Sequence, residues 1–87
     1  MMDDEHIYEI APDGRKFRAT IYEGKYVPLG MAKWVIEVYV PEVEWWYTVE
    51  KSHCGWLWDV AQEHCKDRLN WWANNYLDTP VAEQIVV

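Results

Sequence analysis

Apolar and polar residues alternate along four short stretches in the first half of the chain, the pattern of half-buried β-strands. The stretches are residues 6–11, 16–23, 33–40 and 44–50. The third is the clearest, with Trp34, Ile36, Val38 and Val40 alternating with Val35, Glu37 and Tyr39. Turn-forming residues separate the stretches, most strongly Pro12-Asp13-Gly14. Short turns between successive strands predict an antiparallel meander.

After the fourth strand the apolar period lengthens to that of a helix, and residues 52–77 predict one long amphipathic helix. Ser52 is the expected N-cap, and Pro80 prevents continuation. A rotation of 100° per residue places one set of residues on the apolar side: Leu57, Trp58, Val60, Ala61, His64, Cys65, Leu69, Trp71, Trp72 and Tyr76. This side covers about half the circumference, so we expect the helix to pack on a broad sheet.

The elements together predict an α+β fold, a four-stranded antiparallel β-meander covered on one face by the C-terminal helix. We expect one domain, 1–87, divided into an acidic tail (1–5), a meander (6–50), the helix (52–77) and a C-terminal tail (79–87). That last tail predicts either a short second helix, begun by Thr79-Pro80, or an added edge strand at 85–87.

The second face of the sheet is expected to meet water and to offer an aromatic contact surface. Tyr22, Tyr39 and Trp46 are the candidate residues, unless the opposite set of strand residues faces out. In the fourth strand, Trp45, Tyr47 and Val49 are expected on one face, and Trp46, Thr48 and Glu50 on the other. The chain has seven tryptophans and six tyrosines, more than one small core needs, so some of these rings should be exposed.

Charge narrows the range of partners. The 87 residues include 15 acidic and eight basic ones, for a formal net charge of −7. A uniformly acidic surface repels phosphate, which disfavours nucleic acids and anionic membranes and suits a basic protein. The N-terminus is acidic and no apolar run approaches the length of a membrane span, so we expect a soluble protein of a reducing cytoplasm.

A row of carboxylates is the most specific charged feature. Asp59, Glu63 and Asp67 recur every four residues on the solvent side of the helix, about 6 Å apart along its axis, a roughly phosphate-like spacing. Glu42 and Glu44 add to the acidic balance. The alternative interpretation is an ordinary solvated helix face that Lys66 interrupts.

Three further features of the sequence concern metal binding, catalysis and nucleic-acid binding. His53-Cys54 and His64-Cys65 resemble two halves of a zinc site, but about three helical turns separate them, so we predict no metal, no cofactor and free thiols. No catalytic motif is present, and no enzyme is predicted. Basic residues around the second strand could bind nucleic acid with the aromatic rings, or simply solvate an edge: Arg15, Lys16, Arg18, Lys25 and Lys33.

Arg68 falls on the apolar side of the helix. Either its stem packs on tryptophan while its head reaches water or a carboxylate, or it is buried and waits for a partner's carboxylate.

The leading hypothesis is a non-enzymatic protein-binding module. Its most concrete form is an inhibitor of a basic, nucleic-acid-handling protein or complex, an anti-CRISPR-like or DNA-mimic protein such as phages and mobile elements encode against host defence. The carboxylates would orient the partner and the exposed rings would anchor it. The alternatives are a homodimeric interaction protein and a small nucleic-acid-binding domain.

Overall fold

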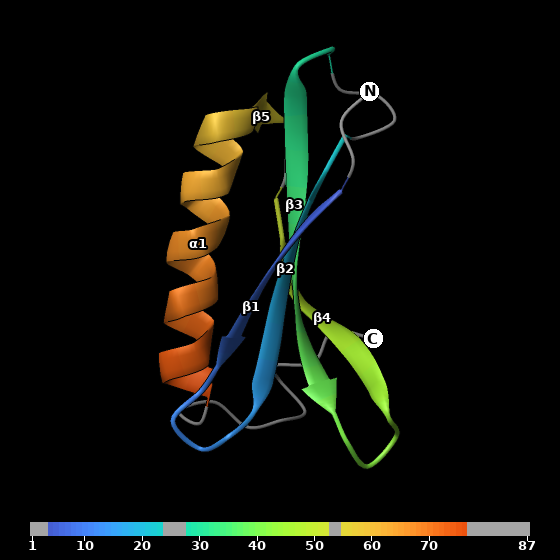
Figure 1. Ribbon diagram of the computed structural model, residues 1–87, viewed down its shortest axis with the longest axis vertical. Coiled ribbons are helices and arrows are strands. Elements are labelled where there is room, and N and C mark those ends of the chain that lie inside the picture. The colour runs from blue at the N-terminus through green and yellow to red at the C-terminus, as the bar shows by residue number, and fades with distance from the viewer. Residues whose placement is uncertain (1–3, 24–27, 53–54, 77–87) are drawn as a thin grey trace.

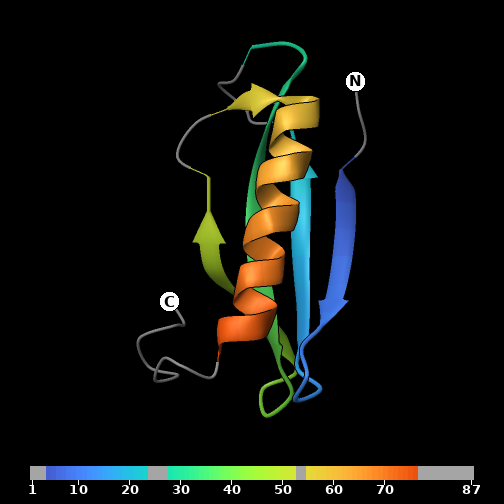
Figure 2. The same cartoon turned by 90° about the vertical axis from the view of Figure 1, so that its left-hand side faces the viewer.

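The sheet and helix of the computed structural model follow one another in chain order. The structure describes residues 4–23, 28–52 and 55–76. The elements are β1 (Glu5–Ile10), β2 (Lys16–Tyr22), β3 (Met31–Val40), β4 (Trp45–Lys51), β5 (Trp56–Leu57) and α1 (Trp58–Asn75). β1 to β4 form an antiparallel sheet in sequence order, and the short β5 also pairs with β3. α1 lies along one face (Figures 1 and 2), so the predicted α+β meander with one covering helix is confirmed.

The predicted start of the helix at Ser52 is wrong. The N–H of Ser52 donates to the carbonyl oxygen of Trp34 at 3.0 Å, and the N–H of Trp34 donates to Oγ of Ser52 at 3.1 Å. Ser52 therefore prolongs the pairing of β4 with β3 instead of capping a helix. α1 begins at Trp58, after β5, and its N-cap Leu57 makes no side-chain capping hydrogen bond.

The other boundaries differ less. Glu5 belongs to β1 and not to a tail. The last turn of α1 ends at Asn75, with Tyr76 as C-cap, whereas the predicted helix ran to residue 77. The predictions for residues 79–87 lie outside the described residues.

The turn between β1 and β2 forms as predicted at Pro12-Asp13-Gly14. Gly14 has φ of 91°, a left-handed conformation that favours glycine, and its N–H donates to the carbonyl oxygen of Ala11 at 2.9 Å. Oδ1 of Asp13 accepts from the N–H of Arg15 at 3.1 Å. These bonds fix the register of the hairpin, in which Tyr8 stands opposite Arg18.

α1 carries four stripes, each made of residues four positions apart. The buried stripe is Ala61, Cys65, Leu69 and Ala73. The opposite, outward stripe is Asp59, Glu63, Asp67 and Trp71, all exposed. Gln62, Lys66, Asn70 and Asn74 lie on the flank toward β1, and Val60, His64, Arg68 and Trp72 lie on the flank toward β4. The buried stripe is narrower than predicted, and Trp71 does not belong to the apolar side.

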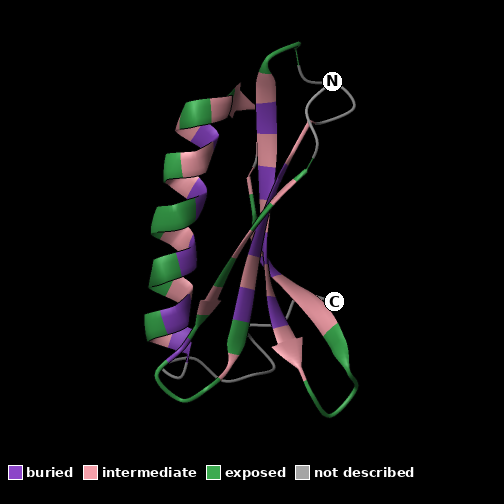
Figure 3. Ribbon diagram, viewed as in Figure 1, coloured by how far each residue is buried: buried purple, intermediate pink, exposed green. Residues whose placement is uncertain are grey.

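The core lies between this stripe and the middle of the sheet. From β2 and β3 it takes the fully buried Phe17, Ala19, Ile21, Ile36 and Val38. Figure 3 shows the burial along the sheet and on the inner side of α1. The helix side of the interface is mostly small, so α1 can approach the sheet closely while the large indole rings fill its flanks.

One irregularity decides which way the end of β4 faces. The pairing of β3 with β4 shifts register between Ile36 and Glu37, so that Thr48 stands opposite Glu37 and Glu50 stands opposite Ile36. Val49 is the extra residue of this β-bulge. Because Ile36 faces α1, Glu50 also faces α1, and its predicted placement on the face of Trp46 and Thr48 is wrong.

Candidate binding surfaces

The outward stripe of α1 presents the predicted row of carboxylates to solvent. Asp59, Glu63 and Asp67 are all exposed, and none has an ion-pair partner among the described residues. Lys66 is exposed on the neighbouring stripe, between Gln62 and Asn70, and makes no ion pair with the row among the described residues. Asp59 is in the first helical turn, where the helix dipole favours a negative charge.

Strand β1 widens the row with two carboxylates that the sequence analysis did not select. Nε2 of Gln62 donates to Oε2 of Glu5 at 2.7 Å, and Nδ2 of Asn70 donates to Oε1 of Glu9 at 3.3 Å. The signal was present in the alternation of Glu5, Ile7 and Glu9, which puts all three on the helix side of the sheet. We call Glu5, Glu9, Asp59, Glu63 and Asp67 together the acidic helix surface.

Glu42 and Glu44 lie elsewhere. Both are exposed in the turn between β3 and β4, where the N–H of Glu44 donates to the carbonyl oxygen of Pro41 at 3.3 Å. This turn projects beyond the end of the sheet (Figure 1). The five predicted acidic residues therefore divide into a row of three on the helix and a separate pair.

The face of the sheet turned away from α1 gathers rings around Trp46. We call it the open sheet face; its charged and aromatic members are His6, Tyr8, Lys16, Arg18, Tyr22, Lys33, Glu37, Tyr39, Trp46 and Lys51. The Trp46 ring contacts Tyr39 edge-on at 5.3 Å and Tyr8 at 6.4 Å between centroids. The guanidinium of Arg18 lies 4.2 Å from the Trp46 ring centre and pairs with Glu37 at 2.9 Å.

The predicted aromatic residues are only partly brought together. Tyr39 and Trp46 face each other across β3 and β4, whereas Tyr22 stands opposite Lys33. Six positions of β3 separate the two places, roughly 20 Å at about 3.3 Å per residue. Tyr8 was missed as a member of the group, and the hairpin register that places it beside Arg18 was the signal. Strand register places this group on the face of the sheet turned away from α1, so the sheet separates it from the row on the helix.

On the β4 flank, Glu50 joins the sheet to the helix. Its carboxylate accepts from Nε of Arg68 at 2.9 Å, from a terminal nitrogen of Arg68 at 2.6 Å and from Nε1 of Trp72 at 2.8 Å. The Arg68 guanidinium also lies 4.7 Å from the centre of the Trp71 ring. Arg68 thus stacks on tryptophan and reaches a carboxylate of its own chain, the first of the two predicted interpretations.

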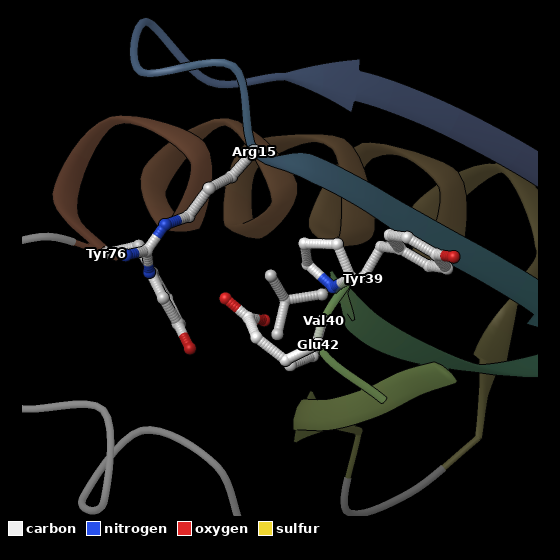
Figure 4. A pocket seen from close by; sticks show the side chains of 7 residues that line it. Arg15, Tyr39, Val40, Glu42 and Tyr76 are labelled. Carbon is white, nitrogen blue, oxygen red and sulfur yellow. The ribbon is translucent and has the colours of Figure 1, made fainter. Parts of the chain in front are cut away.

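A half-open cavity of about 350 Å³ lies between the two turns at the end of the sheet. Arg15, Val38, Tyr39, Val40, Pro41, Glu42 and Tyr76 line it. Figure 4 shows the Arg15 guanidinium beside the ring of Tyr76, 4.7 Å from its centre, with the Glu42 carboxylate directed toward them. Burial raises the pKa of the Tyr76 phenol, and Arg15 opposes that rise. Arg15 makes its ion pair with Asp13, at 3.0 Å, and the cavity lining brings no nucleophile to a base.

Cys65 is buried at the centre of the helix–sheet interface, and its Sγ donates to the carbonyl oxygen of Gln62 at 3.3 Å. His64 turns to the β4 flank and meets Trp56 edge-on, with 4.5 Å between ring centroids. Within the described residues no group of three or more His, Cys, Asp or Glu side chains could hold a metal ion. His53 and Cys54, the other half of the considered zinc pattern, lie outside those residues.

The burial of Cys65 predicts a loss of stability in alkali. Burial raises the pKa of this thiol from 9.0 to about 11, Glu5 adds to the rise and Lys66 opposes it. Because the folded-state pKa is the higher one, the stabilisation is complete below pH 9 and is lost as the pH rises toward 11. Urea unfolding across this range should show a steeper fall for the wild type than for Cys65→Ala, which retains the tyrosine titrations. Parallel curves would contradict the predicted role of the thiol.

Fold and surfaces together define a small α+β domain with carboxylates on its helix side and cations and rings on its open sheet face. No family model, curated protein or solved structure matches the chain. Among the described residues, no helix has the length and apolar character needed to cross a membrane.

Proposed function

We propose that this protein is a non-enzymatic binding module that docks on a basic protein through the acidic helix surface. In its most concrete form it inhibits a nucleic-acid-handling protein by occupying a basic groove with carboxylates. The observation that supports this proposal is the exposed row of Asp59, Glu63 and Asp67, which has no cationic partner within the described residues.

The row is unfavourable for the helix that carries it. Like charges four residues apart destabilise a helix by about 0.2–0.5 kcal/mol per pair, and this row contains two such pairs. A partner with matching cations would offset that repulsion, speed association and set the orientation of the complex. A role in binding would explain why the chain keeps a row of carboxylates that destabilises its helix.

An anchor for this interface is available on the same stripe. Trp71 follows Asp67 by four positions and is 42% exposed. Tryptophan is enriched among the residues that dominate binding energy. Tyr39 and Trp46 lie on the opposite side of the sheet, so a partner seated on the helix would use Trp71 in their place.

The test is a pair of variants that lose the same charge in different places. Glu63→Gln/Asp67→Asn removes two carboxylates from the row, and Glu42→Gln/Glu44→Gln removes two from the β3–β4 turn. Tagged proteins would be used to capture partners from a lysate, which mass spectrometry would then identify. We expect a basic nucleic-acid-handling protein to be retained by the wild type and the turn variant and to be reduced about tenfold or more with the row variant, since close charge pairs couple by about 1.5 kcal/mol or more.

Competition then tests inhibition directly. The purified partner should lose its own nucleic acid when the wild-type protein is added, and keep it when the row variant is added. The row variant should unfold at the same or slightly higher urea concentration, since two repulsions are relieved, so lost binding would not reflect lost folding. Equal capture by both variants would refute the proposal.

A homodimer packed through two open sheet faces is the second candidate. Exposed rings favour it, because Tyr8 is 63% exposed. The charges oppose it, since Lys16, Lys33 and Lys51 give both copies of the open sheet face the same positive charge. Light scattering at micromolar concentration would distinguish a monomer, with a mass of 10.5 kDa, from a dimer of about twice that mass.

A further inference from the structure

Charge is divided between the two faces of the sheet. On the open sheet face the strands carry Lys16, Arg18, Lys33 and Lys51 and a single acidic residue, Glu37. On the face toward α1 the same strands carry Glu5, Glu9 and Glu50 and no cation. A net charge of −7 for the whole chain therefore conceals a basic face.

The single acid on this face is already neutralised. Oε1 of Glu37 accepts from Nε of Arg18 at 3.0 Å, and a terminal nitrogen of Arg18 lies 2.9 Å from the same oxygen. Lys16, Lys33 and Lys51 have no ion pair among the described residues. Three lysines thus remain available to an anion, spread over both ends and one edge of the sheet.

Rings lie between these lysines. Tyr8 projects from the edge strand β1, and Trp46 and Tyr39 form an edge-on pair on β4 and β3. The guanidinium of Arg18 lies over the Trp46 ring, 4.2 Å from its centre, and helps to fix its position. Tyr8 is exposed, and Tyr39 and Trp46 are half-buried. Rings on an antiparallel sheet, with cations around them, are the arrangement on which proteins stack unpaired bases while lysines contact the phosphates.

Distance separates this face from the acidic helix surface. The molecule measures 37 × 21 × 20 Å, and its helix and open face lie on opposite sides of the sheet (Figure 1). The Debye length is about 10 Å at 0.1 M salt, so the helix carboxylates are largely screened from a ligand on the open face. At that ionic strength the local charge, not the net charge, governs what the face attracts.

We propose that the open sheet face binds single-stranded nucleic acid, with bases stacked on Tyr8 and Trp46 and phosphates contacted by Lys16, Lys33 and Lys51. This inference is independent of the proposed function, because it rests on the other side of the sheet. Duplexes fit less well, since their stacked bases cannot reach the rings. A second copy presenting its own open face would bring together two faces of the same positive charge.

Fluorescence anisotropy at about 0.1 M salt with labelled oligo(dT) and oligo(U) of about 12 nucleotides is the direct test. We expect binding of both, with DNA and RNA distinguished by their relative affinity. Tyr8→Ala should weaken binding about tenfold, the loss of one stacked base. Its matched control is Trp45→Ala, since Trp45 is 66% exposed but stands opposite Val40 on the helix side of the sheet, and it should leave affinity unchanged.

A second pair of variants tests the phosphate contacts. Lys16→Gln should lower affinity and reduce the slope of log K against log salt by about 0.7, the value for one phosphate on a single strand. Lys66→Gln removes the same charge from the helix flank and should change neither quantity. Circular dichroism of each variant would check that the fold is retained.

Three results would overturn the proposal. One is the absence of any anisotropy change with either oligonucleotide at low salt. Another is an equal effect of Lys16→Gln and Lys66→Gln, which would mean that binding follows net charge and not this face. The last is binding of an acidic peptide such as polyglutamate without binding of oligonucleotides, which would assign the face to a protein partner.

Discussion

Phe17→Ala is expected to lower the free energy of unfolding by about 3–5 kcal/mol, the range for truncating a buried aromatic ring in a core. Phe17 has no exposed surface, and its ring meets Tyr76 edge-on with 5.4 Å between centroids. Removing the ring leaves a cavity where β2 packs under the last turn of α1. Domains of this size have a total stability of about 5–15 kcal/mol, so this loss would remove a large part of it.

Urea unfolding followed by circular dichroism would measure the effect of Phe17→Ala. Phe17→Leu keeps most of the apolar volume and should lose clearly less, about 1.5 kcal/mol or below. Ile10→Ala is the exposed control, since Ile10 is 68% exposed, and it should stay within about 0.5 kcal/mol of the wild type. A loss below about 1 kcal/mol for Phe17→Ala would show that the ring is not part of a close-packed core.

The sheet could be predicted because its signal is local. Alternation in β3 reproduces its burial, with Ala32, Trp34, Ile36 and Val38 buried between half-exposed neighbours. The first hairpin follows from Pro12-Asp13-Gly14, whose bonds close within four residues. Antiparallel order then needs only short connections, and a helix with one apolar side has to cover one face.

The start of the helix could not be found in the same way. Ser52 is a good N-cap by residue type, but its hydroxyl accepts from the backbone of Trp34, eighteen positions away. A tertiary hydrogen bond of this kind leaves no trace in local sequence. Leu57, which does precede the helix, offers no side-chain cap, so α1 begins where the chain leaves β5 and not where a capping residue stands.

The candidate surfaces also combine features that follow from local sequence with features that depend on tertiary contacts. The row of Asp59, Glu63 and Asp67 follows from helical periodicity alone and is exposed as predicted. Which carboxylates join it depends on strand register, which brings Glu5 beside Gln62 and Glu9 beside Asn70. Net charge describes neither face by itself, because −7 is a sum over two faces of opposite character.

The orientation of Glu50 shows how one inserted residue alters the energetics of the fold. Strict alternation placed Glu50 on the open sheet face, where it would be a solvated carboxylate. The bulge at Val49 turns it toward α1, where it accepts hydrogen bonds from both Arg68 and Trp72. The Glu50 carboxylate thus links β4 to α1 through hydrogen bonds.

Glu50→Ala is accordingly expected to lower the free energy of unfolding by about 2–3 kcal/mol. Breaking a fully buried ion pair costs about 3–5 kcal/mol, and this pair is reduced from that range because the side chains of Arg68 and Glu50 are 39% and 28% exposed. The variant leaves the Arg68 guanidinium and the Trp72 N–H without their acceptor. Glu63→Ala removes an equal charge from the outward stripe and should change stability by about 0.5 kcal/mol or less.

A double-mutant cycle tests whether Glu50 and Arg68 stabilise each other or contribute independently to stability. Arg68→Met keeps the apolar stem of the side chain but removes the cation, and the double variant Glu50→Ala/Arg68→Met leaves neither charge unpaired. We expect the double variant to be more stable than Glu50→Ala, with a coupling of about 1–3 kcal/mol between the two positions in urea unfolding. Additive effects would mean that Glu50 and Arg68 do not stabilise each other, which would contradict the predicted ion pair.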